Sequence, residues 1–546
     1  MDISEGSSPK STPWPLVRWL GLGCVLVAMA GLAVAGPQWQ RNAASSLAAT
    51  ASRQRTMKAP ELEGGVAWLN TAGPLRMKDL RGKIVLLDFW TFCCINCIHV
   101  LPDLAKLEKK YPNELVVIGV HSAKFENEKN TAAIRKAILR YEIAHPVVND
   151  ANMSIWRAFG ARAWPSLILI DPEGEIVWRE SGEGLYEDLD REIANLIKIH
   201  KAKKTLNTKP MKFELALNSG DGNSPLFFPG KVVPDIKGNR LFIADSTHHR
   251  IVITDLAGKK IAIAGTGEPG VKNGAFDAAQ FNDPQGMALR GEILYVADRK
   301  NHLIRALDLK NQTVSTVAGT GEQGRDRDGD GPALKVGLNS PWDVLIIGSQ
   351  MYIAMAGHHQ IWVMDLDKNR ISAFAGDGGE DIVDGRLDRS RFAQPSGLTT
   401  NGRTLWVADS ETSSIRAVPL TSRGEVRTVV GLDLFKFGDE DGVGDNVRLQ
   451  HALGVAYHDG KLYVADTYNN KIKQLDPVTR ECKTFLGGKA EGSEKAPMFS
   501  EPGGITYADG KLYVADTNAH RIRIIDLKTR EVSTLKLQGV EAPKVR

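Results

Sequence analysis

Hydrophobic positions change their spacing at about residue 205. Between 59 and 204, short apolar runs alternate with segments in which apolar residues recur every three or four positions. This alternation of buried strands and amphipathic helices predicts an α/β domain with a central sheet covered on both faces. Between 213 and 540, short segments of alternating hydrophobic and polar residues are separated by glycine turns, which is typical of an all-β domain. Residues 205–212 are the expected linker.

The first domain has a regular order of expected elements. Apolar runs predict strands at 84–89 and 115–120, and helical spacing predicts helices at 94–110, 130–141 and 185–204. Two further strands, at 166–170 and 175–178, are separated by an Asp-Pro-Glu-Gly turn and predict a hairpin.

The second domain repeats one strand motif six times. The motif is an apolar strand that ends in Ala-Asp in five of the copies: Leu241–Asp245, Leu294–Asp298, Met351–Met355, Leu405–Asp409, Leu462–Asp466 and Leu512–Asp516. Successive copies are 53, 57, 54, 57 and 50 residues apart, and other short strands lie between them. Four strands per period of about 50 residues form one propeller blade, and closing the ring removes exposed sheet edges. The sequence predicts six blades and leaves open whether 213–217 or 532–537 completes the last one.

The six motifs resemble the NHL repeat. Four residues after each of them stand His249, His302, His359, Ser413, Asn470 and His520. These residues are either a ring of metal ligands or a turn element repeated in every blade. Since ring symmetry holds equivalent turns apart, the turn is the favoured interpretation. The aspartates of the motif are expected to accept hydrogen bonds from nearby backbone N–H groups.

Residues 19–36, which follow a polar tail of residues 1–18, form an uncharged apolar run. As a helix this run spans about 27 Å, close to the ~30 Å of a bilayer's hydrocarbon core. We therefore expect a transmembrane anchor, with residues 37–58 as its tether. A cleaved signal peptide is the alternative, because Ala33-Val34-Ala35 fits a signal-peptidase site. Basic residues on both sides of the run leave its orientation open.

Composition narrows the choice of partners. The chain of 546 residues is 42% hydrophobic and 25% charged, which excludes wholesale disorder. Its 69 basic and 65 acidic side chains give a net charge of +4, so no nucleic-acid partner is expected. The 53 glycines fit the many turns of a propeller. Five cysteines are too few for a disulfide scaffold.

Three of these cysteines, Cys93, Cys94 and Cys97, lie within five residues, between the expected strand 84–89 and the following helix. Cys94 and Cys97 form a C-x-x-C motif at the helix start. There, unpaired backbone N–H groups and the positive end of the helix dipole stabilise a thiolate. The two-residue spacing lets the second thiol attack a mixed disulfide formed at the first. The pair is a candidate redox site.

On these residues the domain resembles the thioredoxin-like proteins, especially the membrane-anchored, exported thiol-disulfide oxidoreductases. The resemblance implies that Cys94 attacks and that Cys97 resolves the mixed disulfide. It further implies that Asp88 is a buried proton acceptor beneath the pair, and that Pro165 is a cis-proline facing it. The same resemblance implies a single-pass protein of the cell inner membrane with periplasmic soluble domains.

Three features depart from that family's pattern. Cys93 stands where the family has tryptophan, the dipeptide between the cysteines is the unusual pair Ile95-Asn96, and Trp164 stands before Pro165, where the family has a small or polar residue. All three changes affect substrate docking or redox potential, and Cys93 and Trp164 are expected to modulate the site.

Other interpretations of the cysteine cluster stay open. Cys93 and Cys97 with His99 offer soft ligands for Cu(I). A degenerate thioredoxin fold retained only for protein binding is a second alternative. Haem attachment fails because Ile98, and not histidine, follows Cys97. No resident metal or cofactor is expected.

A thioredoxin-like domain followed by six NHL repeats resembles the NHL-repeat-containing protein 2 family. The resemblance implies architecture more directly than activity, because function resides in sites. We expect a membrane-anchored thiol-disulfide oxidoreductase that uses Cys94 and Cys97, with the propeller recruiting a protein partner or substrate. The alternatives are a non-enzymatic scaffold and a Cu(I)-handling protein.

Overall fold

A computed structural model describes residues 57–215, 223–421, 423–488 and 498–544. All of them belong to one compact unit, Thr56–Arg546. The expected membrane segment, 19–36, lies outside the described residues. Among those that are described, no helix has both the length and the apolar composition needed to cross a bilayer.

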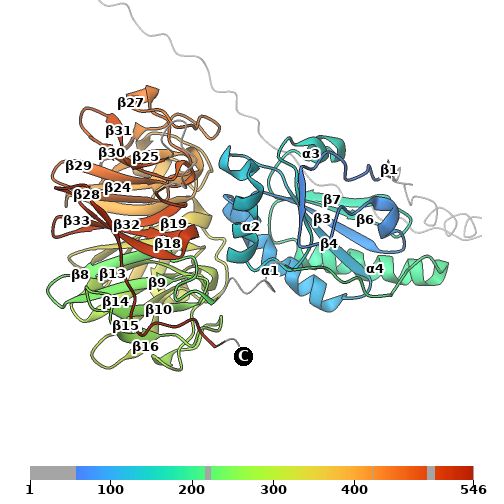
Figure 1. Cartoon of the computed structure of the whole chain (residues 1–546), viewed down its shortest axis with the longest axis horizontal. Helices are drawn as coiled ribbons and strands as arrows, with labels where there is room; N and C mark the ends of the chain where they lie inside the picture. The colour runs from blue at the N-terminus through green and yellow to red at the C-terminus, as the bar shows by residue number, and fades with distance from the viewer. Residues whose placement is uncertain (1–56, 216–222, 422, 489–497, 545–546) are drawn as a thin grey trace, which may run out of the picture. The chain divides into compact units, whose positions relative to one another are not determined.

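The first domain is built on a seven-stranded mixed sheet (Figure 1). Its spatial order is β1-β7-β6-β3-β4-β5-β2, in which β3 pairs in parallel with β4 and antiparallel with β6. The strands are β1 (Met57–Lys58), β2 (Ala67–Leu69), β3 (Ile84–Trp90), β4 (Leu115–His121), β5 (Val147–Asn149), β6 (Ser166–Ile170) and β7 (Glu175–Ser181).

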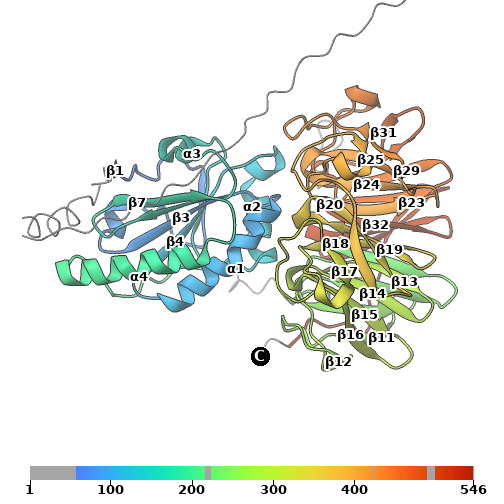
Figure 2. The ribbon, with the colours of Figure 1, turned by 180° about the vertical axis from the view of Figure 1, so that it is seen from behind.

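Helices cover both faces of this sheet (Figure 2). On one face, α1 (Ile95–Lys110) and α4 (Tyr186–Lys203) share a core with β3, and on the other α3 (Ser154–Phe159) does so. α2 (Thr131–Arg140) packs beside the start of α1. Every residue of β3 is buried, because alternate side chains enter the two cores. The chemistry expected at the end of β3 therefore starts from a rigid strand.

The expected strands and helices of this domain are confirmed, with ends that differ by at most three residues. The sequence patterns missed β1, β2, β5 and α3, which contain two, three, three and six residues. Such short segments contain too few positions to display a hydrophobic period.

The second domain is a six-bladed propeller, as the six motifs predict (Figure 1). Its first three sheets comprise β8 (Lys231–Asp235), β9 (Arg240–Asp245), β10 (Arg250–Thr254) and β11 (Lys260–Ala264); β12 (Gly274–Ala275), β13 (Pro284–Arg290), β14 (Ile293–Asp298), β15 (Leu303–Asp308) and β16 (Thr313–Ala318); and β17 (Asp330–Pro332), β18 (Pro341–Ile347), β19 (Gln350–Met355), β20 (Gln360–Asp365) and β21 (Arg370–Ala375).

The other three sheets comprise β22 (Gly385–Arg386), β23 (Pro395–Thr400), β24 (Thr404–Asp409), β25 (Ser414–Pro419) and β26 (Glu425–Val430); β27 (Gly442–Val443), β28 (Gly454–His458), β29 (Lys461–Asp466), β30 (Lys471–Leu475) and β31 (Glu481–Gly487); and β32 (Pro502–Ala508), β33 (Lys511–Asp516), β34 (Arg521–Asp526) and β35 (Val532–Thr534). The short strands β12, β17, β22 and β27 extend four of the sheets at their outer edges.

The ring closes between the sixth blade and the first. Gly504 of β32 donates its backbone N–H to Gly230, next to β8, at 3.0 Å. The last sheet is completed by β35, so the C-terminal candidate for this strand is confirmed. Residues 213–215, the described part of the competing segment, form no strand, and Phe213 instead packs against the core of the first domain.

The residue four positions after each motif connects neighbouring blades. His249, His302, His359, Ser413, Asn470 and His520 all adopt left-handed backbone conformations, with φ between 50° and 56°. Each side chain accepts a hydrogen bond from the backbone N–H of a residue in the next blade, at 2.7–3.2 Å. His520 binds Phe228 in this way and so connects the last blade to the first. These residues are turn elements, and the ring-of-metal-ligands interpretation is wrong.

The motif aspartates hold the backbone that precedes each inner strand. Asp298 Oδ1, for example, accepts the N–H of Asn282 at 2.7 Å, while its Oδ2 pairs with Arg305 at 2.9 Å. In the third blade, Met355 and Trp362 stand at the corresponding positions, and Met355 Sδ accepts the N–H of Asn339 at 3.4 Å. Acid and base are replaced together there, so neither charge is left buried alone.

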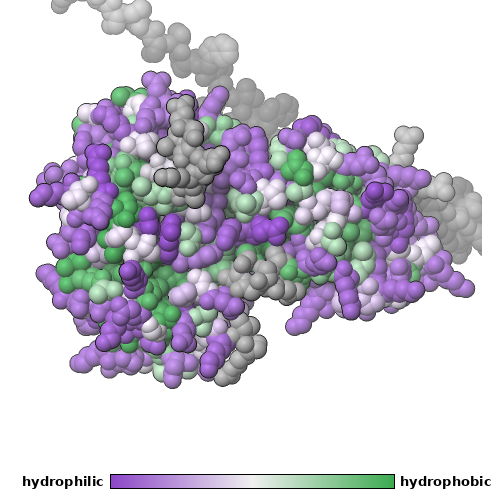
Figure 3. All heavy atoms as spheres, viewed as in Figure 1, coloured by the Kyte–Doolittle hydropathy of each residue, from purple (hydrophilic) through white to green (hydrophobic). Residues whose placement is uncertain are grey.

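The molecular surface is largely polar. Hydrophilic residues dominate the face shown in Figure 3, with apolar residues in small groups between them. Large exposed hydrophobic side chains are few among the described residues, the most exposed being Val478 and Phe435.

Candidate functional site

The C-x-x-C motif lies where β3 passes into α1. Cys94 is the N-cap residue of α1, and its Sγ accepts the backbone N–H of Cys97 at 3.4 Å. Cys94 is half-buried, whereas Cys97 is fully buried and both are free thiols. Of the two thiols, Cys94, to which the resemblance assigns the attack, is the more accessible.

A buried carboxyl group lies beneath the pair. Asp88 is fully buried in β3, and within the described part of the chain neither of its carboxyl oxygens has a hydrogen-bond partner. Burial raises the pKa of Asp88 to about 7, and His145 opposes that shift. Burial also raises the pKa of the Cys97 thiol well above its ordinary value, and the neighbouring Cys94 and Asp88 raise it further. Cys97 therefore needs a nearby proton acceptor before it can react.

Cys93 occupies a separate, enclosed position. Its backbone N–H donates to Glu128 Oε1 at 2.9 Å, and the other Glu128 oxygen accepts the N–H groups of Lys124 and Phe125. Burial raises the pKa of the Cys93 thiol, and the carboxylates of Glu128 and Glu411 add to this effect. Cys93 is therefore held as a neutral thiol.

The segment before β6 also faces the site. The Trp164–Pro165 peptide bond is cis, as the resemblance implies. Trp164 donates its indole N–H to the carbonyl of Ser122 at 2.9 Å and packs on Trp156 at 4.7 Å. It also packs against the hydrophobic cluster that contains the cysteines. Trp164 thus occupies the surface beside the C-x-x-C motif.

The first domain contacts a set of equivalent propeller residues, here named the docking ring: Phe228, Asp283, Ser340, Gln394, His451 and Glu501. Each immediately precedes an inner strand or lies within three residues of one, and all have left-handed φ values between 46° and 62°. They are the residues whose N–H groups are bound by the preceding blade. Their backbone is thus fixed. Five of the side chains contact the first domain, whereas that of Asp283 binds Arg299 and Gln285 within the propeller.

Gln394 of the docking ring holds the cysteine loop directly. Its side-chain oxygen accepts the N–H of Ile95 at 2.8 Å, and its side-chain nitrogen donates to the carbonyl of Cys93 at 2.9 Å. The two bonds flank Cys94 on either side. A residue about 300 positions away in the sequence therefore holds the backbone of the C-x-x-C motif.

Further contacts surround this clamp. Lys124 forms a buried ion pair with Glu411, in which both side chains are at most 6% exposed. The Phe125 ring packs on His451 and Tyr468 at centroid distances of 5.4 and 5.6 Å, and Asn127 donates to Glu501 at 2.9 Å. A buried, paired charge and tight ring packing favour one arrangement of the two domains.

The geometry gives no support to the copper hypothesis. Both ring nitrogens of His99 are engaged, Nδ1 with Glu183 at 2.5 Å and Nε2 with Ser340 at 2.6 Å. Among the residues that the structure describes, the single grouping of three potential metal ligands is Asp171, Glu173 and His200, away from the cysteines. Lys203 pairs with Glu173 there at 2.7 Å.

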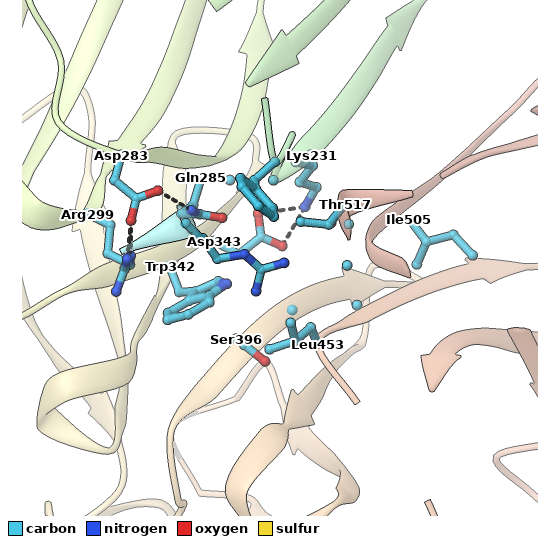
Figure 4. Close-up of a pocket in the computed structure, with 18 of the residues that line it drawn as sticks. Lys231, Asp283, Gln285, Arg299, Trp342, Asp343, Ser396, Leu453, Ile505 and Thr517 are labelled. Atoms are coloured by element: carbon cyan, nitrogen blue, oxygen red, sulfur yellow. Dashed lines mark hydrogen bonds and ion pairs between the residues drawn. The ribbon is translucent and has the colours of Figure 1, made fainter. Parts of the chain in front are cut away.

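The axial channel of the propeller is a second candidate site (Figure 4). It encloses a cavity of about 50 Å³ between the inner strands, and Arg140 and Tyr141 of the first domain also line it. Its charges neutralise each other: Lys231 pairs with Asp343 at 2.5 Å, and Asp283 binds both Arg299 and Gln285. The cavity is small and its charged groups are paired, so the cysteine site is the stronger candidate.

Sequence reasoning identified the cysteines, Asp88, Pro165 and Trp164, and the structure brings them to one region. It missed Gln394, Glu128 and Glu411. Glu128 lies in a short 3-10 helix, Asn127–Lys129, where its side chain alone is buried, and no local sequence signal marks it or the two propeller residues. A contact between segments so far apart in sequence follows from the docking of two complete domains.

Comparisons with known proteins agree with this architecture. Residues 82–176 match the thioredoxin-like family model, and residues 499–525 match the NHL repeat. Fold and site together define a thioredoxin-like domain, related to thiol-disulfide oxidoreductases, fused to an NHL propeller.

The full-length similarity is more specific. NHL repeat-containing protein 2 of Gallus gallus is 43% identical over 491 residues, covering 83% of this chain and 67% of the relative. The human protein of that name is 43% identical over 489 residues, with 82% and 67% coverage. The chain belongs to the NHL repeat-containing protein 2 family.

Other relatives cover different parts of the chain. Protein SUPPRESSOR OF QUENCHING 1, chloroplastic, of Arabidopsis thaliana is 46% identical over 473 residues, and the match spans 83% of this chain but 45% of that relative. Thiol-disulfide oxidoreductase YkuV of Bacillus subtilis is 26% identical over 139 residues, or 25% of this chain and 93% of the relative. Among solved structures, a thioredoxin-like superfamily protein matches 26% of the chain at 29% identity, with a TM-score of 0.24.

Proposed function

We propose that the protein is a thiol-disulfide oxidoreductase whose redox pair is Cys94 and Cys97. The observation that carries the proposal is the graded burial of three groups. Cys94 is half-buried at a helix N-cap, whereas Cys97 and Asp88 are fully buried. Kinship with thiol-disulfide oxidoreductases over the first domain supports it.

The proposed reaction transfers two electrons from the protein to a protein disulfide. The Cys94 thiolate attacks one substrate sulfur, a Cys94–substrate disulfide forms, and the other sulfur leaves as a thiolate that takes a proton from water. Cys97 then gives its proton to the Asp88 carboxylate, and its thiolate attacks Cys94 Sγ. The Cys94–Cys97 bond forms and the second substrate thiolate leaves. A dithiol on a partner protein restores the reduced pair by the reverse steps.

The raised pKa values fit these roles. Cys97 stays protonated until an acceptor is available, which prevents its premature reaction with solvent oxidants. A carboxyl group with a pKa of about 7 both accepts and releases a proton near neutral pH, the condition under which acid–base catalysis is most effective.

The propeller is proposed to recruit the protein partner. Its docking ring is occupied by the chain's own first domain, so the opposite end of the inner strands is the surface left for a partner. A cavity of about 250 Å³ opens there, between residues such as Leu289, Leu345 and Tyr507.

We also propose that residues 19–36 anchor the chain in the inner membrane with periplasmic soluble domains, a proposal that rests on the sequence. Extraction with alkaline carbonate tests it, because an anchored chain stays with the membrane and a version starting at residue 37 is released.

Thiol trapping tests the redox proposal. Full-length protein is equilibrated in glutathione buffers of graded potential, acid-quenched and alkylated, and the thiols are counted by mass spectrometry. We expect Cys94 and Cys97 to close together in a two-electron transition, while Cys93 stays reduced. Cys94→Ser and Cys97→Ser should each abolish the transition, and Cys482→Ser, which alters a buried cysteine of the propeller, is the matched control. A pair that never closes at any potential would refute the proposal and leave the scaffold as the better account.

A further inference from the structure

Several buried polar atoms converge beneath the redox pair and have no protein partner among the described residues. They are both carboxyl oxygens of Asp88, the indole Nε1 of Trp90 and Nε2 of His145. Buried polar groups in folded proteins are nearly always hydrogen-bonded, because an unpaired one loses its bonds to water without replacement. A group of four such atoms in one place is therefore a feature that packing and stability do not explain.

Gly119 marks the point where these atoms meet. Asp88 of β3 pairs with Gly119 of β4, so their side-chain positions share one face of the sheet on strands about 4.8 Å apart. A Cβ placed on Gly119 would lie 2.8 Å from Trp90 Nε1 and 3.5 Å from His145 Nε2. The absence of a side chain at residue 119 thus leaves a space bordered by Trp90 Nε1, Val147 Cγ2 and His145 Nε2, beside the strand position of Asp88.

His145 connects this space to the surface. Its Nδ1 lies 3.4 Å from Glu108 Oε2, on the opposite side of the ring from Nε2. The His145 side chain is 4% exposed and that of Glu108 is 26% exposed. Both line an open groove of about 240 Å³ beside α1. The imidazole therefore has one nitrogen toward the buried carboxyl group and the other toward a solvent-accessible carboxylate.

We propose that His145 and Glu108 form the route by which the proton taken up by Asp88 reaches solvent. The inference rests on the proposed thiol-disulfide exchange. After Asp88 accepts the Cys97 proton, His145 Nε2 takes it, directly or through one water molecule. His145 Nδ1 releases a proton to Glu108, and Glu108 releases it to solvent. The carboxylate of Asp88 is restored and His145 regains its starting protonation state, so the proton has left the interior. Cys97 of α1 and His145, in the segment between α2 and β5, are the titratable groups that act on Asp88.

The route predicts a slow step with a visible intermediate. Reduced full-length protein is mixed with oxidised glutathione, quenched with acid at increasing times and analysed by mass spectrometry. In wild type, the Cys94–glutathione mixed disulfide should be short-lived. In Glu108→Gln and His145→Gln, formation of this species should be unchanged, whereas its closure should slow by about tenfold at pH 7, part of the 10²–10⁴ typical of a complete acid–base group. In the Glu108→Gln protein, conversion of the mixed disulfide to the Cys94–Cys97 disulfide should also become faster as the concentration of imidazole buffer rises. A purely structural defect would not respond to the buffer in this way.

A matched control is available in the same groove. Glu142 has a side chain that is 47% exposed and pairs with Lys300 and His249, not with His145. In the Glu142→Gln protein, the mixed disulfide should convert to the Cys94–Cys97 disulfide at the wild-type rate. If wild type itself never forms the Cys94–Cys97 disulfide, the proposed function fails. If the Cys94–Cys97 disulfide forms in wild type, and forms equally fast in Glu108→Gln and His145→Gln, the proposed proton route alone is overturned. Should His145→Gln fail to fold, Glu108→Gln decides, because its side chain is partly exposed.

Discussion

Replacing Asp88 with asparagine should stabilise the protein while impairing its chemistry. Burial raises the pKa of Asp88 from 3.8 to about 7. The folded state therefore holds a proton that the unfolded state has lost, and stability falls as pH rises from about 4 to about 7. At 1.36 kcal/mol per pKa unit, burying Asp88 costs the folded protein about 4 kcal/mol at pH 8, where the group ionises, and roughly 2 kcal/mol at pH 5, where it takes up a proton on folding. The asparagine variant has no such cost at either pH.

Denaturant unfolding of the reduced full-length proteins at pH 5 and pH 8 measures this difference, with hydrogen exchange of β3 and β4 peptides reporting the local unfolding. The free-energy advantage of Asp88→Asn should grow by roughly 2–3 kcal/mol between these pH values. The cost of burying the amide itself does not depend on pH, so it cancels from that increment. Closure of the mixed disulfide should slow by roughly 10²-fold or more in the same variant. If the stability gained by Asp88→Asn is equal at pH 5 and pH 8, Asp88 is not a buried carboxyl group that lacks a compensating partner.

Three further predictions concern the surroundings of the cysteines. Gln394→Ala removes both hydrogen bonds to the cysteine loop, so we expect Cys94 to react faster with iodoacetamide and the protein to lose about 2 kcal/mol of stability; an unchanged alkylation rate would argue against the clamp. Lys124→Met leaves Glu411 buried and unpaired, which should cost about 3–5 kcal/mol in denaturant unfolding, and the added change Glu411→Gln should recover most of the loss. Since burial and two carboxylates raise the pKa of the Cys93 thiol, Cys94 should be alkylated well before Cys93 between pH 7 and 9, as peptide mapping can show; equal rates would refute the enclosure of Cys93.

The sequence predicts the architecture well because both domains repeat strong local signals. Six copies of one motif specify a ring, and β3 followed by the helix at Cys94 specifies the redox loop. The turn function of His249 and its equivalents also follows from repetition, because a residue that recurs in every blade serves a need that every blade shares. Closure by β35 had to await the structure, since two segments offered similar strands.

The rest of the site could not be read from local patterns. Gln394 looks like any loop glutamine beside a proline, and its role appears only when two folded domains meet. His145 follows a helix and precedes a short strand, and no local pattern marks it as a site residue. Its position beside Gly119 depends on β3, β4 and β5 being assembled. Tertiary packing brings such distant residues together, and the hydrophobic periodicity of a local segment contains no information about it.

The docking ring has a consequence for the rotational orientation of the first domain about the propeller axis. Six backbone-equivalent positions give the propeller six settings, about 60° apart, at which a partner domain meets the same main-chain geometry. The side chains differ at every position, so the settings are unequal. A rotation by one blade would bring Ser340 or His451 under the cysteine loop in place of Gln394, and neither offers an amide that both donates and accepts there. We therefore expect side-chain identity at these six equivalent points to set the orientation of the thioredoxin-like domain on the propeller, and substitutions there to alter that orientation before they alter either fold.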